Sequence, residues 1–217
     1  MMKYLDSLCP ELQNSLKTLN NWRPVQEKAF EKGLLERKNI LVCSPTASGK
    51  TLVAEIALVE NAIRMKKIGI YLAPLKALAN EKYKEFKKKY PFLKIGISTG
   101  DFDSDDNKLG YYDILFLTAE KADSLIRHKS SWINDKGIVV IDEFHLLNDI
   151  KRGPVLEIVI TLLKQFLKDV QFIALSATVG NPKEIANWLD ANLVYDEWRP
   201  VKLKLGILNK RLNFMKE

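Results

Sequence analysis

Cysteine and histidine are scarce in this 217-residue sequence, which contains two of each. Cys9 and Cys43 are far apart, and Cys43 lies inside an apolar run. The pair therefore does not indicate a disulfide framework, and we expect a reducing compartment. His128 and His145 add no cluster with the spacing of zinc ligands, so we predict no zinc site.

Targeting and membrane-spanning patterns are also missing from the sequence. Residues 1–12 include acidic side chains and lack the apolar core of a signal peptide. No apolar run is long enough to cross a bilayer, and we find neither an internal repeat nor a low-complexity linker. We therefore expect a cytoplasmic protein without a membrane partner.

The composition that remains is typical of a folded chain with a substantial core. Hydrophobic residues make up 47% of the sequence and charged residues 28%, and the length permits one large domain or at most two small ones. The net charge of +7 favours an anionic partner, with nucleic acid first. The alternative is a lysine-rich surface that serves only solubility.

Short apolar runs alternate with helical segments along the chain. Strands are predicted at 39–44, 69–74, 93–98, 113–118, 137–142 and 170–176. Helices are predicted at 51–66, 75–90, 122–128, 155–168 and, after a start resembling a capping box at Asn181, 182–190. This order predicts an α/β fold, with a mainly parallel sheet covered by helices on both faces. Ligands of such sheets bind beyond the C-terminal strand ends, where we find Ser44, Pro74, Thr118, Asp142 and Ser176.

The segment SPTASGKT at 44–51 is close to the phosphate-binding pattern G-x-x-x-x-G-K-[ST], but Ser44 replaces the first glycine. Gly49 allows a tight turn, Lys50 can reach the β and γ phosphates, and the Thr51 hydroxyl can ligate Mg²⁺. A polar turn is the alternative. The candidate nucleotide-binding residues are Ser44, Pro45, Thr46, Ala47, Ser48, Gly49, Lys50 and Thr51.

A second strand end supplies the carboxylates that such a site needs. In GIVVIDEFH, an apolar strand is followed by Asp142 and Glu143. Asp142 is suited to holding Mg²⁺, usually through its water shell, and Glu143 to polarising the attacking water. Two acids at the start of a helix are the alternative interpretation. Together with the phosphate loop, the pair predicts a site for ATP and Mg²⁺.

SPTASGKT, DEFH and LSAT (175–178), in this order at strand ends, resemble motifs I to III of superfamily-two helicases of the DExH type. That family commonly has Ser or Ala where Ser44 stands. Further matching segments are RPVQEKAF, APLKALANEKY, STGD, TAEKADSLIR, KRGPVLE, LSATVGNPKEIANWL and WRPVKL. They resemble the branch of archaeal Holliday-junction-migration-type DNA repair helicases, the helicase part of DNA polymerase theta and, more distantly, Ski-type RNA helicases. The resemblance covers about residues 20–205 and implies a three-layer, recombinase-like P-loop NTPase fold.

The resemblance implies roles for further residues. Gln26 matches a glutamine that reads adenine, although the sequence alone favours an ordinary surface glutamine. An amide can pair with adenine N7 and its N6 amino group. His145 would lie near the γ phosphate and couple it to Ser176 and Thr178, and a purely structural histidine is the alternative.

Nucleic-acid contacts in this family come from strand-end loops and helix N-termini that face phosphates. The matching residues here are Pro74, Leu75, Lys76, Thr99, Gly100, Asp101, Thr118, Ala119 and Glu120. We expect binding that is independent of sequence and weakens with salt. For the lysines within 82–89 we favour a solvated helix face, and for Arg152 both a nucleic-acid contact and a capping role stay open.

The resemblance also implies that this is one part of a longer helicase. Residues 1–205 would form the first motor domain, with a helical part at 1–38, and residues 206–217 would lead to a second motor domain that supplies an arginine. The segment VKLKLGIL (201–208) alternates apolar and basic residues and is either one more strand or the start of the linker. The expected protein is a 3′-to-5′ helicase of DNA repair and recombination, associated with the nucleoid, that acts on single-stranded or forked DNA. An RNA helicase, a nucleotide-binding module without catalysis and another translocating motor are the alternatives. The isolated chain is expected to have weak activity or none.

Overall fold

The computed structural model describes residues 3–100, 106–128, 136–201, 207–208 and 214–215. Its main sheet has seven strands in the order β3-β4-β2-β5-β6-β1-β7, and all neighbouring strands are parallel. The strands are β1 (Ile40–Cys43), β2 (Ile68–Ala73), β3 (Ile95–Ser98), β4 (Ile114–Thr118), β5 (Lys136–Ile141), β6 (Gln171–Ser176) and β7 (Asn192–Tyr195). The predicted α/β fold with a parallel sheet is confirmed.

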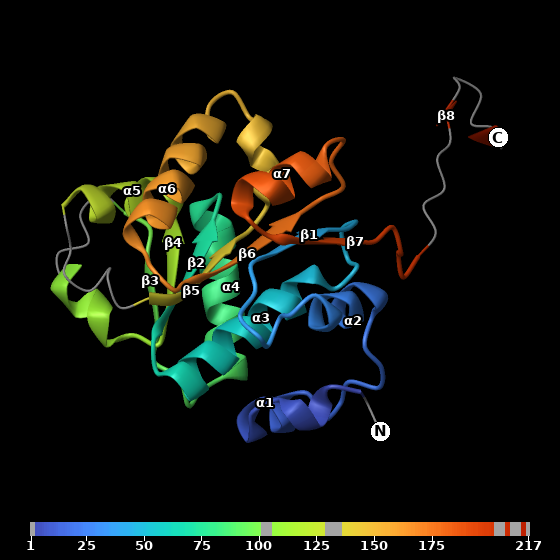
Figure 1. Cartoon of the computed structure of the whole chain (residues 1–217), viewed down its shortest axis with the longest axis horizontal. Helices are drawn as coiled ribbons and strands as arrows, with labels where there is room; N and C mark the ends of the chain where they lie inside the picture. The colour runs from blue at the N-terminus through green and yellow to red at the C-terminus, as the bar shows by residue number, and fades with distance from the viewer. Residues whose placement is uncertain (1–2, 101–105, 129–135, 202–206, 209–213, 216–217) are drawn as a thin grey trace.

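Helices cover both faces of this sheet, as Figure 1 shows. One face carries α1 (Pro10–Ser15), α2 (Pro24–Glu31), α3 (Lys50–Glu60) and α4 (Lys76–Lys89). The other face carries α5 (Ala119–Arg127), α6 (Gly153–Phe166) and α7 (Pro182–Leu189). Each face has its own apolar core because successive side chains of a strand point to opposite sides. In β5, for example, Val140 packs in the core under α3 and Ile141 in the core under α6.

Element boundaries depart from the predictions where local hydrogen bonding decides them. Helix α5 begins at Ala119 rather than at residue 122, because Thr118 caps it: its side chain accepts a hydrogen bond of 3.3 Å from the Lys121 N–H. The predicted helix at 51–66 is α3 followed by a π-helical turn, Asn61–Met65. The capping box at Asn181 is wrong, since its side chain donates to the Glu184 carboxylate at 2.9 Å and makes no capping bond.

Two strand features go beyond the six predicted strands. Strand β7 joins the sheet edge beside β1, and it was missed because only Val194 of its four residues is buried, so it has no continuous apolar run. Ile207–Leu208 (β8) and Phe214–Met215 (β9) form a separate antiparallel pair, in a tail for which both a strand and a linker were considered. Within the described ranges, no helix has the length and apolar character that a membrane span requires.

The strand order decides where a ligand can bind. Strands β1 and β5 lie on either side of β6, so the loops that follow them leave the sheet at the same edge. With strands about 4.8 Å apart, these two loops begin about 10 Å from one another. That separation suits an extended phosphate chain lying across the end of β6.

Candidate active site

The phosphate-loop candidate, residues 44–49, connects β1 to the N-terminus of α3. Its first residue, Ser44, is fully buried, and its hydroxyl lies 2.7 Å from the hydroxyl of Ser48. The Ser44 N–H donates to the Ser176 carbonyl at 3.2 Å, which ties the loop to β6. The hydroxyl bond between Ser44 and Ser48 is one that a glycine at position 44 would lack, whereas the backbone bond would remain.

Two residues in left-handed conformations bend the loop over the start of α3. Ala47 has φ 64°, and Gly49, directly before α3, has φ 100°. A β-carbon at Gly49 would approach the Gln26 Nε2 to 2.6 Å and the Arg23 Cδ to 2.9 Å. Only glycine fits this conformation and this space without displacement. The dipole of the eleven-residue α3 points its positive end at the loop and favours an anion there.

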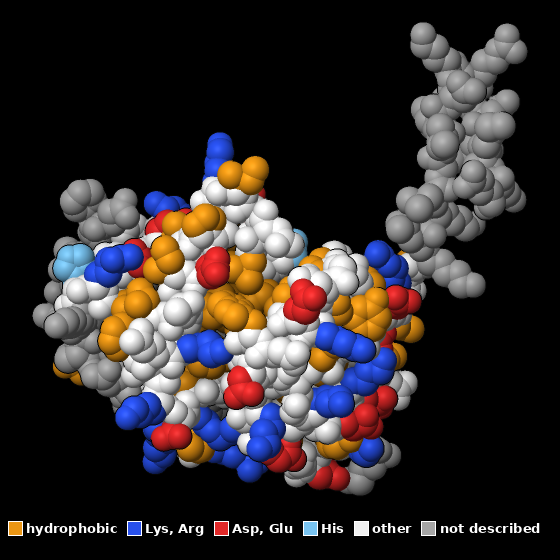
Figure 2. Space-filling model, turned by 45° about the horizontal axis from the view of Figure 1, so that its top comes forward, with side chains coloured by type: hydrophobic (Ala, Val, Ile, Leu, Met, Phe, Trp, Pro, Cys, Tyr) orange, Lys and Arg blue, Asp and Glu red, His pale blue; other side chains and the backbone are white. Residues whose placement is uncertain are grey.

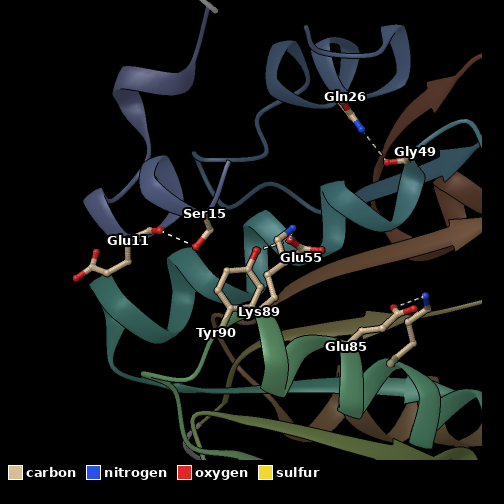
Figure 3. A network of polar contacts seen from close by, with 9 residues as sticks. Glu11, Ser15, Gln26, Gly49, Glu55, Glu85, Lys89 and Tyr90 are labelled. Atoms are coloured by element: carbon tan, nitrogen blue, oxygen red, sulfur yellow. Dashed lines mark hydrogen bonds and ion pairs between the residues drawn. The ribbon is translucent and has the colours of Figure 1, made fainter. Parts of the chain in front are cut away.

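Gln26 lies against the loop, where its side-chain amide makes two hydrogen bonds. Its Nε2 donates to the Gly49 carbonyl at 3.1 Å (Figure 3), and its Oε1 accepts from the Arg23 N–H at 2.8 Å. The residue is 2% exposed. A primary amide has a second N–H and a second lone pair, so these bonds leave it one donor and one acceptor for an adenine edge.

Asp142 follows β5 directly, and its carboxylate is held from two sides. The Tyr71 hydroxyl donates to Oδ2 at 2.6 Å, and the Glu143 N–H donates to Oδ1 at 2.9 Å. Burial raises the pKa of Asp142, the Tyr71 hydrogen bond opposes this, and the Glu143 charge adds to it, so the net direction is upward. Burial raises the pKa of Tyr71 well above its ordinary value, and the Asp142 carboxylate raises it further, so the hydroxyl stays protonated and donates.

Lys50 begins α3 after the loop from β1, and Asp142 directly follows β5, so both lie beyond the C-terminal ends of strands although 91 residues separate them in sequence. The positive charge of Lys50 favours the ionised form of Asp142 and lowers its pKa, against the larger effect of burial. Lys50 is 7% exposed and Asp142 is 6% exposed. The structure thus brings together the lysine and the first carboxylate on one side of the sheet, with Glu143 next to them.

Glu143 is in the left-handed region, at φ 48° and ψ 46°. Such a conformation costs a non-glycine residue about 1–2 kcal/mol, and residues of this kind concentrate at functional sites. The strained turn directs the Glu143 side chain to His145: Oε2 lies 3.4 Å from the His145 Nδ1. The Glu143 carboxylate and the His145 imidazole are therefore in contact, and we call them the Glu143–His145 pair.

His145 also connects Glu143 to the segment after β6. The Ala177 N–H donates to His145 Nδ1 at 3.4 Å, which requires that nitrogen to be unprotonated. A protonated Nδ1 would instead donate to Glu143, so the two contacts belong to different protonation states. Ser176 is fully buried at the end of β6, whereas Thr178 is exposed. His145 lies between the carboxylate pair and this segment.

The residues predicted to contact nucleic acid lie at the same edge of the sheet, over the half formed by β3, β4 and β2. Pro74, Leu75 and Lys76 lead from β2 into α4, and Leu75 is 44% exposed. Thr99 and Gly100 follow β3 and are partly exposed. Thr118 caps α5 and is buried, Glu120 is exposed, and Asp101 lies outside the described residues.

A narrow cleft connects the two halves of this edge. Pro74, Glu120, Asp142 and Arg152 are among its lining residues. Arg152 precedes α6, and its N–H donates to the Asp149 carboxylate at 2.9 Å. Its backbone therefore belongs to the helix start, and the residue lines the same cleft as Asp142 and Pro74.

Three basic side chains of α4 contact other residues of the chain. Lys82 pairs with Glu85 at 2.8 Å, Lys87 donates to the Tyr83 hydroxyl at 3.0 Å, and Lys89 pairs with Glu55. Because α4 runs back from the C-terminal strand edge, Lys87 and Lys89 lie at its far end. Figure 2 shows Lys and Arg side chains interspersed with Asp and Glu over the face that it draws. The charged side chains on that face therefore do not indicate where nucleic acid would bind.

Two residues of the site were missed by sequence reasoning. Tyr71 lies in a buried strand, where an aromatic residue normally only packs, so its bond to Asp142 had no signal. Arg23 donates from Nη1 to the Ala47 carbonyl at 2.5 Å and stacks its guanidinium 5.7 Å from the Trp198 ring centre. Both contacts join segments far apart in the sequence, and no local pattern reveals them.

The donor set suits Mg²⁺ delivered with phosphate better than a metal bound by protein alone. No group of three or more His, Cys, Asp or Glu side chains with metal-binding geometry occurs in the described part of the chain. Mg²⁺ commonly takes one or two carboxylates and keeps water and substrate phosphate as further ligands. Asp142 and the Thr51 hydroxyl, beside the loop that Gly49 bends over the start of α3, fit that requirement.

Curated sequences similar to this chain are archaeal helicases. The chain is 53% identical over 202 residues to the ATP-dependent DNA helicase Hel308 of Methanocaldococcus jannaschii, covering 89% of this chain and 17% of that one. It is 49% identical over 195 residues to Hel308 of Pyrococcus horikoshii, covering 89% of this chain and 27% of that one. The chain thus spans about a quarter or less of the length of these relatives.

Solved structures agree at the level of the fold. The helicase MrfA bound to DNA superposes with a TM-score of 0.75 at 23% identity, over 88% of this chain and 30% of that one. The helicase Lhr of Mycobacterium smegmatis, bound to single-stranded DNA and AMP-PNP, gives a TM-score of 0.74 at 25% identity, over 88% and 28%.

A protein-family model also matches most of the chain. It matches residues 23–185, which include Gln26, the phosphate loop, the carboxylate pair and the segment after β6. The chain belongs to the DEAD/DEAH box helicase family.

Proposed function

We propose that this chain is the first motor domain of an ATP-dependent DNA helicase that acts in DNA repair and recombination. The observation that carries the proposal is the placement of Lys50 and Asp142: the loops that follow β1 and β5 bring them to the same edge, on either side of the end of β6. A lysine and a carboxylate held there, next to a loop bent by Gly49, are the groups that Mg²⁺-bound triphosphate requires.

Each residue has a chemical task in ATP hydrolysis. Lys50 and the N–H groups at the start of α3 bind the β and γ phosphates, and Thr51 and Asp142 hold Mg²⁺, which supplies positive charge to the phosphate oxygens. Glu143 orients the attacking water and accepts its proton. His145 passes the state of that carboxylate to Ser176 and Thr178, since its Nδ1 contacts either Glu143 or Ala177. Gln26 reads the adenine edge with the donor and acceptor that remain to it.

Nucleic acid binds along the β3, β4 and β2 half of the same edge. The helix N-termini at Leu75–Lys76 and at Ala119–Glu120 offer backbone N–H groups to phosphates, which gives binding without sequence preference. Thr118 contributes by holding the first turn of α5, because its hydroxyl accepts from the Lys121 N–H. Thr99, Gly100 and Asp101 would continue the path beyond β3. The names of the curated relatives support DNA as the substrate, and single-stranded or forked DNA and 3′-to-5′ movement follow from the resemblance.

The motor requires a second domain. We assign residues 1–205 to the first motor domain, with a helical part at 1–38, and residues 206–217 to the connection that follows. A second motor domain would supply an arginine to the phosphate site, an effect of about 10³–10⁵ in rate. The 217-residue chain alone should therefore bind ATP with Mg²⁺ weakly and hydrolyse it very slowly. In the cell, a protein with this function would be associated with the nucleoid.

Turnover by the native full-length protein tests this proposal. ATP hydrolysis is measured with single-stranded DNA, with RNA of the same sequence and without nucleic acid, at several salt concentrations. DNA should stimulate hydrolysis more than RNA, and the stimulation should fall as salt rises. Stimulation by RNA alone would replace the DNA assignment, and hydrolysis that neither nucleic acid changes would contradict a motor function.

A further inference from the structure

Tyr71 joins the core of the protein to the carboxylate that we assign to Mg²⁺. It lies in β2, next to β5, and is fully buried. Successive side chains of a strand alternate between faces, so Val140 and Asp142 of the β5 segment point to the same side of the sheet. Tyr71 packs in the core on that side, which is covered by α3 and α4, and this brings its hydroxyl to Asp142.

The ring of Tyr71 is fixed by an aromatic cluster beneath α4. Its ring centre lies 4.9 Å from that of Phe116 and 6.2 Å from that of Phe86. Phe86 and Phe116 in turn pack edge to face at 5.2 Å. Aromatic pairs at such distances prefer defined orientations, so the hydroxyl of Tyr71 has a fixed position relative to the sheet.

The bond from this hydroxyl determines how the Asp142 carboxylate is rotated. The last torsion of an aspartate side chain has a broad energy minimum, and the Glu143 N–H holds only Oδ1. The Tyr71 hydroxyl holds Oδ2 at 2.6 Å, which fixes the second oxygen. Each carboxylate oxygen has two lone pairs, so both oxygens keep a lone pair for Mg²⁺ or its water ligands.

We propose that Tyr71 is a positioning residue for Mg²⁺: its hydroxyl holds the Asp142 carboxylate in the orientation that receives the ion with ATP. This inference rests on the proposed function, because it requires Asp142 to act on Mg²⁺. Hydrogen-bond partners of metal-binding groups typically contribute about 10–100-fold in metal affinity or activity.

The test compares Y71F with a matched control in the same cluster. Tyr90 is also fully buried, its ring packs on Phe86 at 5.9 Å, and its hydroxyl donates to Glu55 rather than to Asp142 (Figure 3). Both Y71F and Y90F remove one buried hydroxyl and keep the ring. Mg²⁺ is titrated at fixed, saturating ATP and DNA into the native full-length protein and each variant, and ATP turnover is measured.

Y71F should raise the Mg²⁺ concentration for half-maximal turnover about tenfold or more, the lower end expected for such a partner. Turnover at saturating Mg²⁺ should change much less, and Y90F should stay within about twofold of the wild type on both measures. An unchanged Mg²⁺ requirement in Y71F, or an equal increase in Y90F, would overturn the inference and leave the proposed function standing. A wild-type protein whose turnover needs no Mg²⁺ would overturn both.

A second comparison tests whether Tyr71 acts through the Asp142 carboxylate. Binding of ATP over a range of Mg²⁺ concentrations is measured in D142N and in the double variant Y71F/D142N. If Tyr71 acts through the carboxylate, adding Y71F to D142N should leave the Mg²⁺ dependence within about twofold. A further tenfold loss in the double variant would show that Tyr71 acts by another route and would refute the positioning role.

Discussion

The substitution G49A tests the geometry of the phosphate loop, because the structure gives the distances that an added β-carbon would have to its neighbours. A β-carbon at this position would lie 2.6 Å from the Gln26 Nε2 and 2.9 Å from the Arg23 Cδ, and φ is 100°. Placing an L-residue in the left-handed region costs about 1–2 kcal/mol. Displacing the Gln26 amide also removes its bond to the Gly49 carbonyl, which contributes about 1 kcal/mol.

The total loss is therefore about 2–3 kcal/mol in the free energy of unfolding. For a chain of this size, 1 kcal/mol corresponds to about 2–4 °C in Tm, so thermal unfolding of G49A followed by circular dichroism should show a Tm about 4–12 °C lower. ATP binding should fall as well, since the loop no longer closes around phosphate.

Gly180 provides a matched control for this experiment. A β-carbon there would have no neighbour within 4 Å, and its φ is outside the range that disfavours side chains. G180A should therefore change the free energy of unfolding by about 0.5 kcal/mol or less, as most exposed substitutions do. A Tm of G49A within about 1 °C of the wild type, or equal to that of G180A, would refute the geometry described for the loop.

Three further substitutions or labels test other parts of the site. E143Q should lower the turnover of the full-length protein by at least about 10² and leave ATP binding unchanged, because Gln cannot accept the proton of the attacking water; unchanged turnover would remove Glu143 from that role. Burial raises the pKa of Cys43 to about 11 and that of Cys9 to about 12, so iodoacetamide at pH 8 should label the folded chain at least about a hundredfold more slowly than the unfolded chain. Because the folded pKa of Asp142 is raised, its protonated form favours folding, and this contribution is lost as pH rises through the raised pKa. D142N should therefore stabilise the metal-free chain at neutral pH and progressively less as pH falls, which thermal melts from pH 4 to 8 would show; a constant difference would contradict the assigned shift.

The sequence predicted the fold and the phosphate edge because both depend on local patterns. Apolar runs define the strands, Asp142-Glu143 directly follows one of them, and Gly49-Lys50 closes the loop that follows another. Parallel connections bring such strand ends to one edge without further information. The alternation of apolar strands and helices was therefore sufficient to predict that these residues meet at one edge of the sheet.

The contacts that fix the site could not be predicted in the same way. The bond from Tyr71 to Asp142 depends on the alignment of β2 with β5, in which Leu72 is opposite Ile141. The bonds of Gln26 to Gly49 and of Arg23 to Ala47 depend on how α2 packs beside the loop. These are tertiary relationships, and a tyrosine in a strand or a glutamine in a helix has many other uses.

Chemical labelling of lysines by an ATP derivative tests whether Lys50 lies at the phosphates of bound ATP. An acyl phosphate of ATP transfers its acyl group to a lysine amine close to the terminal phosphates, and mass spectrometry identifies the residue. Lys50 should be acylated in the presence of Mg²⁺, and excess ATP should suppress this acylation. Acylation confined to other lysines such as Lys82 or Lys87, with Lys50 unmodified, would contradict it.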